Sequence, residues 1–224
     1  MKNLSKLLTI AFIICMTSAS FAQTFGVKAG FNASNFLAMD KDDTYSDDFK
    51  MNPGFHIAAT AEYPLTDMFS FETGMGLSTK GYRIDESETI LGHTLTVKGG
   101  TNLLYVDIPL TAKATFDLGK AKVYGVFGPY LGFGIIGKMK YELSVMGESE
   151  TEETEIKWGS DEAKDDIKRF DYGLIIGAGV DINAIQFGLS YGLGLANISA
   201  YTDNHSLINN RVLGLSIGYK FGVR

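Results

Sequence analysis

The chain has 224 residues and carries 26 acidic against 20 basic side chains, which gives a formal net charge of −6. An acidic chain of this length fits a single domain and is a poor candidate for binding nucleic acid. After residue 22, no segment approaches the roughly 18 consecutive apolar residues of a transmembrane helix. Only a closed barrel of strands could therefore hold this chain in a membrane.

The chain begins with the three parts of a secretory signal peptide. Residues 1–6 are basic, and residues 7–16 are apolar but too few to span a bilayer. Ser20-Phe-Ala22 then presents small residues at the positions that a signal peptidase reads. We predict a cleaved signal peptide at 1–22 and a single mature domain at 23–224.

Two other interpretations of the first segment are weaker. A membrane anchor would need a longer apolar core, and a lipoprotein signal at Cys15 would need a small residue where the bulky Ile14 stands. Cleavage after Ala22 removes Lys2, Lys6 and the single cysteine, so the net charge of the mature chain would change from −6 to −8. A mature chain without cysteine suits an exported protein that does not rely on disulfides.

Segments of alternating apolar and small or polar residues follow along the mature domain. The clearest is 185–195, where Ile185, Phe187 and Leu189 begin an apolar row that alternates with glycine, serine and glutamine. A strand with one apolar and one nearly bare face suits a barrel with lipid outside and a hydrated or salt-bridged interior. We predict eight strands, at 24–36, 53–64, 69–83, 101–116, 122–140, 169–183, 185–199 and 210–222.

The alternation assigns a lipid-facing side to most strands. In the first and last strands this side holds Phe25, Val27, Ala29 and Phe31, then Leu213, Leu215, Ile217, Tyr219 and Phe221. The strand at 122–140 is bulky on both faces and contains Pro129, which has no donor for the ladder. We therefore predict a β-bulge near Pro129.

The connections between the predicted strands alternate between short and long. Residues 64–68, 117–121 and 183–184 make tight turns, whereas the long polar connections are 37–52, 84–100, 141–168 and 200–209. Outer-membrane barrels have this asymmetry, with short periplasmic turns and longer outward loops. The pattern predicts an all-β, antiparallel, up-and-down transmembrane barrel of eight strands, so that residues 23–224 form a single outer-membrane β-barrel domain.

Charged residues within the strands fall on the inward-facing side. Lys80, Asp107 and Asp171 are placed toward the outer half. A basic residue on the lipid face near the midplane would cost roughly 2–4 kcal/mol, so inward placement is favoured. We predict a salt-bridge network that plugs the lumen, with a proton or ion pathway as the alternative. Its six residues, three basic and three acidic, lie toward the periplasmic end: Lys28, Glu62, Glu72, Lys113, Asp181 and Lys220.

Two of the long loops are strongly acidic. Residues 141–168 contain ten acidic and three basic side chains, and residues 37–52 add five aspartates. Such loops could hold calcium, but neither has the regular ligand spacing with a central glycine of a helix-loop-helix site. We therefore expect solvated, self-repelling loops with no metal or cofactor, in which Trp158 could pin part of 141–168 or contact a partner.

The three histidines raise an enzyme hypothesis. His56, His93 and His205 are all predicted near the outer rim, and Asp203 and Ser206 flank the last of them. Rim loops are polar in any case, and the mature chain has no nucleophile elbow, metal-binding helix motif or phosphate-binding glycine loop. We predict a protein without catalytic residues.

Several segments in order along the chain carry a family resemblance. They are Phe25–Asn35, Tyr105–Leu110, Gly128–Gly132, Phe170–Val180 and Leu213–Phe221. Together they resemble the outer-membrane β-barrel proteins of the PorT family of Bacteroidota. The resemblance implies an outer-membrane location and, since PorT is linked to cargo export by the type IX secretion system, a link to secretion. It supplies no catalytic motif.

These observations predict a non-enzymatic integral outer-membrane barrel of the OmpA and OmpX kind, with a structural or interaction role and a plugged lumen. An accessory component of a type IX-like secretion machine is one alternative, and a small passive channel is another. The predicted partners are outer-membrane lipid and, through loops 37–52 and 141–168, secretion-system or surface proteins.

Overall fold

The computed structural model describes residues 23–41, 49–90, 93–145, 148–201 and 206–222. The predicted signal peptide at 1–22 lies outside the described residues. The described part of the chain forms nine strands and contains no helix long and apolar enough to cross a membrane. The strands are β1 (Thr24–Met39), β2 (Asn52–Pro64), β3 (Phe69–Ile90), β4 (His93–Asp117), β5 (Lys122–Val145), β6 (Glu148–Glu155), β7 (Phe170–Ile182), β8 (Ile185–Gly194) and β9 (Leu207–Phe221).

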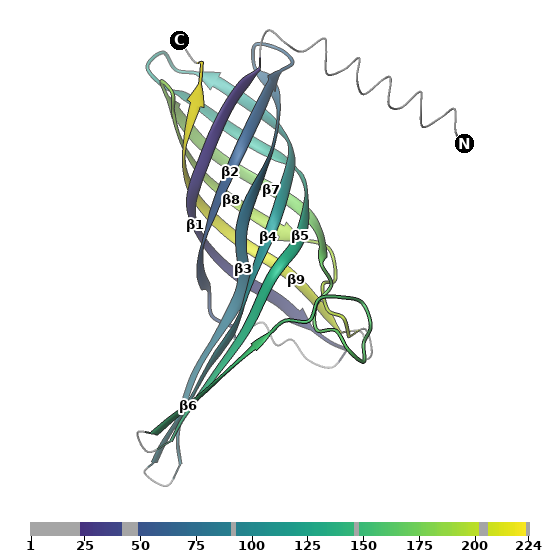
Figure 1. The fold of residues 1–224 in the computed structure, drawn as a ribbon. Helices are drawn as coiled ribbons and strands as arrows, with labels where there is room; N and C mark the ends of the chain where they lie inside the picture. Colours follow the sequence, from purple (N-terminus) through teal and green to yellow (C-terminus); the bar gives the residue numbers. More distant parts are fainter. Residues whose placement is uncertain (1–22, 42–48, 91–92, 146–147, 202–205, 223–224) are drawn as a thin grey trace, which may run out of the picture.

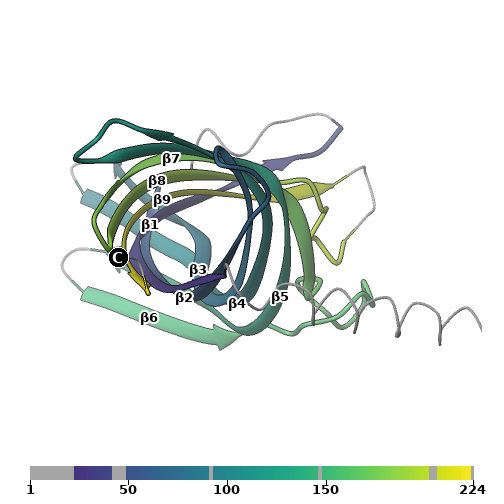
Figure 2. The same ribbon diagram turned by 90° about the horizontal axis from the view of Figure 1, so that it is seen from above.

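Eight of the nine strands close into a barrel (Figures 1 and 2). Each pairs antiparallel with the next, β5 pairs with β7, and β9 pairs with β1 from Phe25 to Met39. The predicted all-β, up-and-down antiparallel barrel is confirmed. The strand count differs, because β6 pairs only with β5 and stands outside the ring.

The tight turns gather at one end of the barrel, close to the last residues of β9 (Figure 1). Gly119 adopts a φ of 87°, and its amide donates a hydrogen bond to Asp117 Oδ1 at 2.7 Å. A glycine suits this position because other residues rarely adopt a positive φ. We call this the turn end, and the opposite end the loop end.

The wall of the barrel is apolar outside and polar inside. Phe31 is 80% exposed and lies opposite Leu215, which is 61% exposed. On the inner side, Lys113 and Gln186 are almost completely buried. This confirms the face assignment of the first and last strands and is the reverse of a soluble barrel, whose apolar side chains fill the interior.

The predicted bulge near Pro129 is wrong. The register of β5 against β4 and β7 stays constant through this residue. The irregularity lies further along β5, where Leu104 pairs with Ile136 and Tyr105 with Gly134, so that Ile135 has no partner. Ile135 and Ile136 are both exposed as a result.

Four strands continue beyond the barrel at the loop end as a tongue-shaped sheet (Figure 1). This outer extension consists of residues 83–90, 93–101, 138–145 and 148–155. The prediction of a long loop is therefore wrong for most of 84–100, and for 141–145 and 148–155 within the predicted loop 141–168. The acidic β6 forms a strand because its glutamates face basic residues of β5: Lys138 binds Glu153 at 2.6 Å, and Lys140 lies opposite Glu153.

Two other predicted loops are shorter than expected. β1 continues to Met39 and β9 begins at Leu207. The centres of both loops, 42–48 and 202–205, lie outside the described residues.

Candidate functional site: the barrel interior

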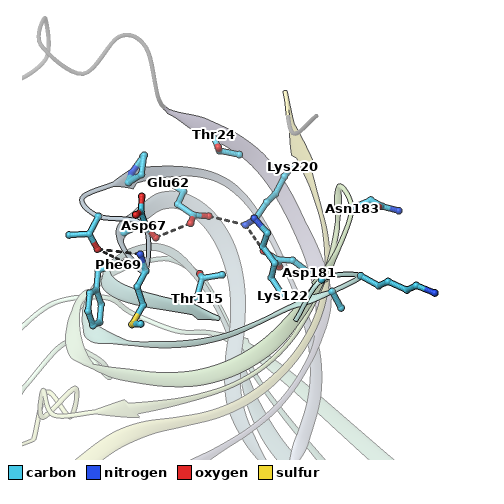
Figure 3. Close-up of a pocket in the computed structure, with 16 residues that line it drawn as sticks. Thr24, Glu62, Asp67, Phe69, Thr115, Lys122, Asp181, Asn183 and Lys220 are labelled. Carbon is cyan, nitrogen blue, oxygen red and sulfur yellow. Dashed lines mark hydrogen bonds and ion pairs between the residues drawn. The ribbon is translucent and has the colours of Figure 1, made fainter. Parts of the chain in front are cut away.

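The interior begins at the turn end with an open cavity of about 530 Å³ (Figure 3). Thr24, Phe69, Thr115 and Lys122 lie around it. Its floor is charged, because Glu62, Lys220 and Asp181 form a chain of ion pairs across it (Figure 3). The cavity therefore ends at a charged barrier.

This barrier contains all six residues that the sequence predicts to pair, and we call these six the turn-end cluster. Lys113 Nζ lies 3.0 Å from Glu62 Oε2 and 3.3 Å from Glu72 Oε2. Lys28 binds Glu72 at 2.5 Å, and Lys220 binds Glu62 at 2.9 Å and Asp181 at 2.6 Å. The structure thus brings Lys28, Glu62, Glu72, Lys113, Asp181 and Lys220 into one connected network.

The register of the strands explains why this network needs Lys113. Glu62 of β2 lies directly opposite Glu72 of β3, and like charges in such a pair repel each other. Lys113 enters from β4 with its side chain 0% exposed and contacts both carboxylates. Its ammonium also lies 4.3 Å from the centre of the Tyr124 ring.

Neutral side chains also donate hydrogen bonds to the carboxylates of the turn-end cluster. Gln186 donates a hydrogen bond to Asp181 Oδ1 at 2.9 Å, and Ser70 donates one to Glu62 Oε1 at 2.8 Å. Three bases balance three acids. A buried charge network is tolerated when charges are paired and the remaining hydrogen-bonding atoms have partners.

A second group of charges, the middle cluster, lies nearer the loop end around Lys80. Its ammonium is 3.0 Å from Asp107 Oδ1 and 3.0 Å from Asp171 Oδ2, and it lies 4.5 Å from the ring centres of Tyr105 and Tyr130. Asp171 Oδ2 also accepts hydrogen bonds from the Tyr130 hydroxyl and from Asn210. Lys80, Asp107 and Asp171 were predicted to face inward at this level.

Between the two clusters lies a cavity of about 160 Å³. His56 lines it, and His56 Nδ1 is 2.7 Å from Asn32 Oδ1. The prediction that His56 lies at the outer rim is therefore wrong, because its partner on β1, Gly30, lies well within the wall. The side chains of His93 and His205 lie outside the described residues.

The loop end is closed by apolar side chains that we call the apolar cap. After β6 the chain folds back over the barrel, and Ile156 and Ile167 are buried together with Leu103, Tyr105 and Ile198. Trp158 packs against this group, edge to face with Tyr105 at a centroid distance of 5.8 Å. Further buried members are Phe36 and Ala196.

Two inward-facing glycines of β5 make room for the cap. A Cβ at Gly134 would collide with the Trp158 ring, and a Cβ at Gly137 would lie 2.7 Å from Ile156 Cβ. Trp158 is held from the other side by Arg169, whose guanidinium lies 5.7 Å from its ring. Trp158 thus pins the segment after β6, one of the two roles that the sequence leaves open for it.

Sequence reasoning did not find the cap as a unit. Its members come from strands and from irregular segments around 156–167 and 196–198, so no periodicity links them. A signal was present in Ile156 and Trp158, two large apolar residues in an otherwise acidic loop. Among the described residues, no three histidine, cysteine or acidic side chains form a group that could hold a metal ion.

A closed antiparallel barrel with an apolar outer wall and a charged interior defines an integral membrane β-barrel. Residues 21–200 match the family described as outer membrane protein beta-barrel domain. The chain belongs to this family, and it is a protein of the outer membrane. The turn end of the barrel therefore faces the periplasm and the outer extension faces outward.

The chain is also similar to solved outer-membrane structures. Neisserial surface protein A is 14% identical with a TM-score of 0.42, and the alignment covers 88% of this chain and 97% of that one. OprG of Pseudomonas aeruginosa is 14% identical with a TM-score of 0.42, covering 89% and 96%. Ail of Yersinia pestis is 18% identical with a TM-score of 0.34, covering 90% and 100%. No curated protein sequence matches the chain.

Proposed function

We propose that this protein is a non-enzymatic outer-membrane barrel with a structural or interaction role and a closed lumen. The observation that carries the proposal is a series of three barriers along the barrel axis. The turn-end cluster, the middle cluster and the apolar cap each join side chains from several strands. An eight-stranded barrel leaves an interior just wide enough for side chains to fill, and three such layers across it support a closed lumen.

With a closed lumen, the outer surfaces of the barrel are where this protein would meet other molecules. The outer extension continues four strands beyond the wall and exposes Tyr141 and Leu143 as well as the acidic β6. A barrel that does not conduct would act through such surfaces, as an anchor that presents them to surface or secretion-system partners. The segments proposed to meet such partners are the loops 37–52 and 141–168, and the second of these includes residues 141–145 and 148–155 of the outer extension.

A role as an accessory component of a type IX-like secretion machine is the second candidate. It is supported by the resemblance of Tyr105–Leu110 and Gly128–Gly132 to the PorT family of Bacteroidota, and these two segments lie on the adjacent strands β4 and β5. The open cavity at the periplasmic end would then be one place for a partner to bind. Stoichiometric co-purification of periplasmic or membrane subunits after mild detergent extraction would favour this candidate.

Ion flux from lipid vesicles tests the closed lumen. Vesicles containing the wild-type protein should hold an ion gradient as well as empty vesicles do. A variant in which Lys113, Glu62, Lys80 and Asp107 are all replaced by alanine keeps the net charge of each cluster unchanged and opens space, although Asp171 loses its cation. This variant should leak if it still folds. Heat-modifiable mobility on gels reports folding. Wild-type leakage equal to that of the variant would favour a small passive channel instead.

A further inference from the structure

The outward-facing side of the outer extension carries a groove lined by cations, although the chain as a whole is acidic. The groove has a volume of about 230 Å³. Its lining includes Arg83, Lys98, Gly100, Asn102, Lys140 and Glu142. We call it the basic groove.

The strand register places its basic residues around one glycine. Gly100 of β4 lies directly between Arg83 of β3 and Lys140 of β5. Because neighbouring strands are about 4.8 Å apart, the two backbones that carry these cations are about 10 Å apart. Gly100 is itself buried, and a Cβ there would collide with the Tyr82 carbonyl oxygen, so it forms the floor of the groove. The groove above it, with a volume of about 230 Å³, has room for an anion the size of a phosphate group.

The remaining two sides of Gly100 also present donors. Lys98 and Asn102 lie two residues before and after it on β4, and therefore on the same face. Asn102 Oδ1 accepts a hydrogen bond from Asn52 Nδ2 at 2.7 Å, which leaves the amide nitrogen of Asn102 as a donor toward the groove. Four donor side chains thus line the groove around Gly100.

The cations of the groove differ from their neighbours in having no ion-pair partner. On the same face Lys50 pairs with Asp85 at 3.9 Å, and Lys138 pairs with Glu153 at 2.6 Å. Asp85 and Glu142 lie opposite Lys98 in the strand register, and Glu153 lies opposite Lys140, but Asp85 and Glu153 pair with Lys50 and Lys138 instead. Among the described carboxylates, none lies within ion-pair distance of Arg83, Lys98 or Lys140, all of which are exposed. Glu142 is the one acid lining the groove, so the lining carries an excess of positive charge.

The groove lies just beyond the lipid-facing belt. Phe133 and Ile136 are exposed lipid-facing residues of β5, and Lys140 follows Ile136 by four residues on the same side. With a rise of about 3.4 Å per residue and a strand tilt of roughly 40°, Lys140 stands about 10 Å above the last apolar residue. Long basic side chains reach back toward the interface, so this is the level of lipid headgroups.

We propose that the basic groove binds the phosphate group of a lipid headgroup in the outer leaflet. Arg83 supplies planar paired donors that match a phosphate, and Lys98 and Lys140 supply point charges. A lipid is favoured over a soluble phosphate because the acyl chains lie against the apolar belt directly below. This holds the headgroup at a high effective concentration beside the groove. The site lies outside the lumen and is independent of whether the barrel conducts.

Native mass spectrometry of the full-length mature protein in neutral detergent tests this site, with dioleoyl phosphatidic acid as the probe and dioleoyl phosphatidylcholine as the reference lipid. Arg83→Gln and Lys140→Gln should each weaken phosphatidic acid binding about tenfold, since each removes one charge-assisted hydrogen bond. Lys120→Gln is the control, because this exposed lysine lies at the turn end, at the opposite end of the barrel from the groove. Glu142→Gln should tighten binding by removing the one acid.

Two results would overturn the proposal. Equal affinities for all four variants and the wild type would show that the groove is not the site. Displacement of the lipid by inorganic phosphate at concentrations similar to that of the lipid would show a site for free anions instead. Unchanged heat-modifiable mobility in each variant ensures that a loss of binding reflects the groove and not the fold.

Discussion

Replacing Lys113 by methionine should destabilise the barrel more than any other single substitution in the turn-end cluster. Its side chain is fully buried and contacts Glu62 and Glu72, with Asp181 3.9 Å away. Without it, two bases face three acids and one carboxylate is left without compensation. Breaking a buried network by removing one partner costs roughly 3–5 kcal/mol, so we expect a loss of that order in the free energy of unfolding.

A second substitution should restore much of this loss. Glu62→Gln in the Lys113→Met background leaves two complete pairs, Lys28 with Glu72 at 2.5 Å and Lys220 with Asp181 at 2.6 Å. The amide oxygen introduced at position 62 could still accept the hydrogen bond that Ser70 donates to Glu62. We expect the double variant to recover at least half of the stability lost by Lys113→Met, which is the non-additivity typical of residues in one network.

Denaturant unfolding in detergent micelles or lipid vesicles, followed by circular dichroism and by heat-modifiable mobility, measures both effects. The reasoning would be refuted by a Lys113→Met variant that unfolds within about 1 kcal/mol of the wild type, well below the cost of a broken buried pair. It would equally fail if the double variant were less stable than Lys113→Met alone, because the two side chains would then not be coupled through charge.

Three further predictions concern the cap, the outer extension and the wall. Gly134→Ala should push the ring of Trp158, the single tryptophan of the chain, out of the apolar cap and shift its fluorescence to longer wavelength. Gly125→Ala on the same strand is the control, because a Cβ has space there and the emission should not shift. Unchanged emission from Gly134→Ala would contradict the packing of Trp158 in the cap. The hydrogen bond from Lys138 and its positive charge lower the pKa of Glu153 in the folded protein. This pair therefore stabilises β6 fully at pH values above the ordinary glutamate pKa, and the stabilisation is lost as the pH falls through the lowered pKa of Glu153. Hydrogen exchange of β6 amides should therefore be slower in the wild type than in Lys138→Gln at neutral pH and similar in acid, and a difference that persists in acid would disprove the assignment. Leu215→Arg on the exposed outer wall should lower the free energy of unfolding in lipid vesicles by about 2–4 kcal/mol, while Leu65→Arg in an exposed turn should change it little. Equal losses of stability would argue against a lipid-facing wall.

The alternation of residue types was enough to predict which side chains form the outer wall of the barrel and which fill the half of its interior nearer the turn end. In β8, for example, Phe187 and Leu189 face out while Gln186 faces in, as a period of two requires. The same parity placed Lys113 and Glu72 inside. Since charged residues are costly on a lipid face, sequence alone could assign their side of the wall.

Pairing between strands was harder to predict, because it depends on register and on how far each strand extends. The β6 sequence has no apolar residue, so its pairing with Lys138 and Lys140 becomes visible only when β5 is known to continue to Val145. The bulge at Ile135 had a local signal, since two adjacent isoleucines break the alternation there. Pro129 was misleading, because its missing donor did not disturb the register.

The basic groove was also beyond the reach of sequence reasoning. Arg83 and Lys140 are the last residues of the predicted strands 69–83 and 122–140, whereas Lys98 lies in the predicted loop 84–100, so nothing in the sequence placed the three together. Only the hairpin pairing of β3 with β4, and of β4 with β5, brings them around Gly100. The net charge of the chain did not predict this groove, because an acidic chain can still bring several cations together at one height along the barrel axis.

Single-channel recording of the wild-type protein in planar lipid bilayers tests the closed lumen most directly. The turn-end cluster, the middle cluster and the apolar cap together predict a flat current trace, with no stepwise conductance after insertion is verified by heat-modifiable mobility. Reproducible conductance steps of uniform size from the wild-type protein would contradict the account, because ions would then be crossing the level of Lys113 and Lys80.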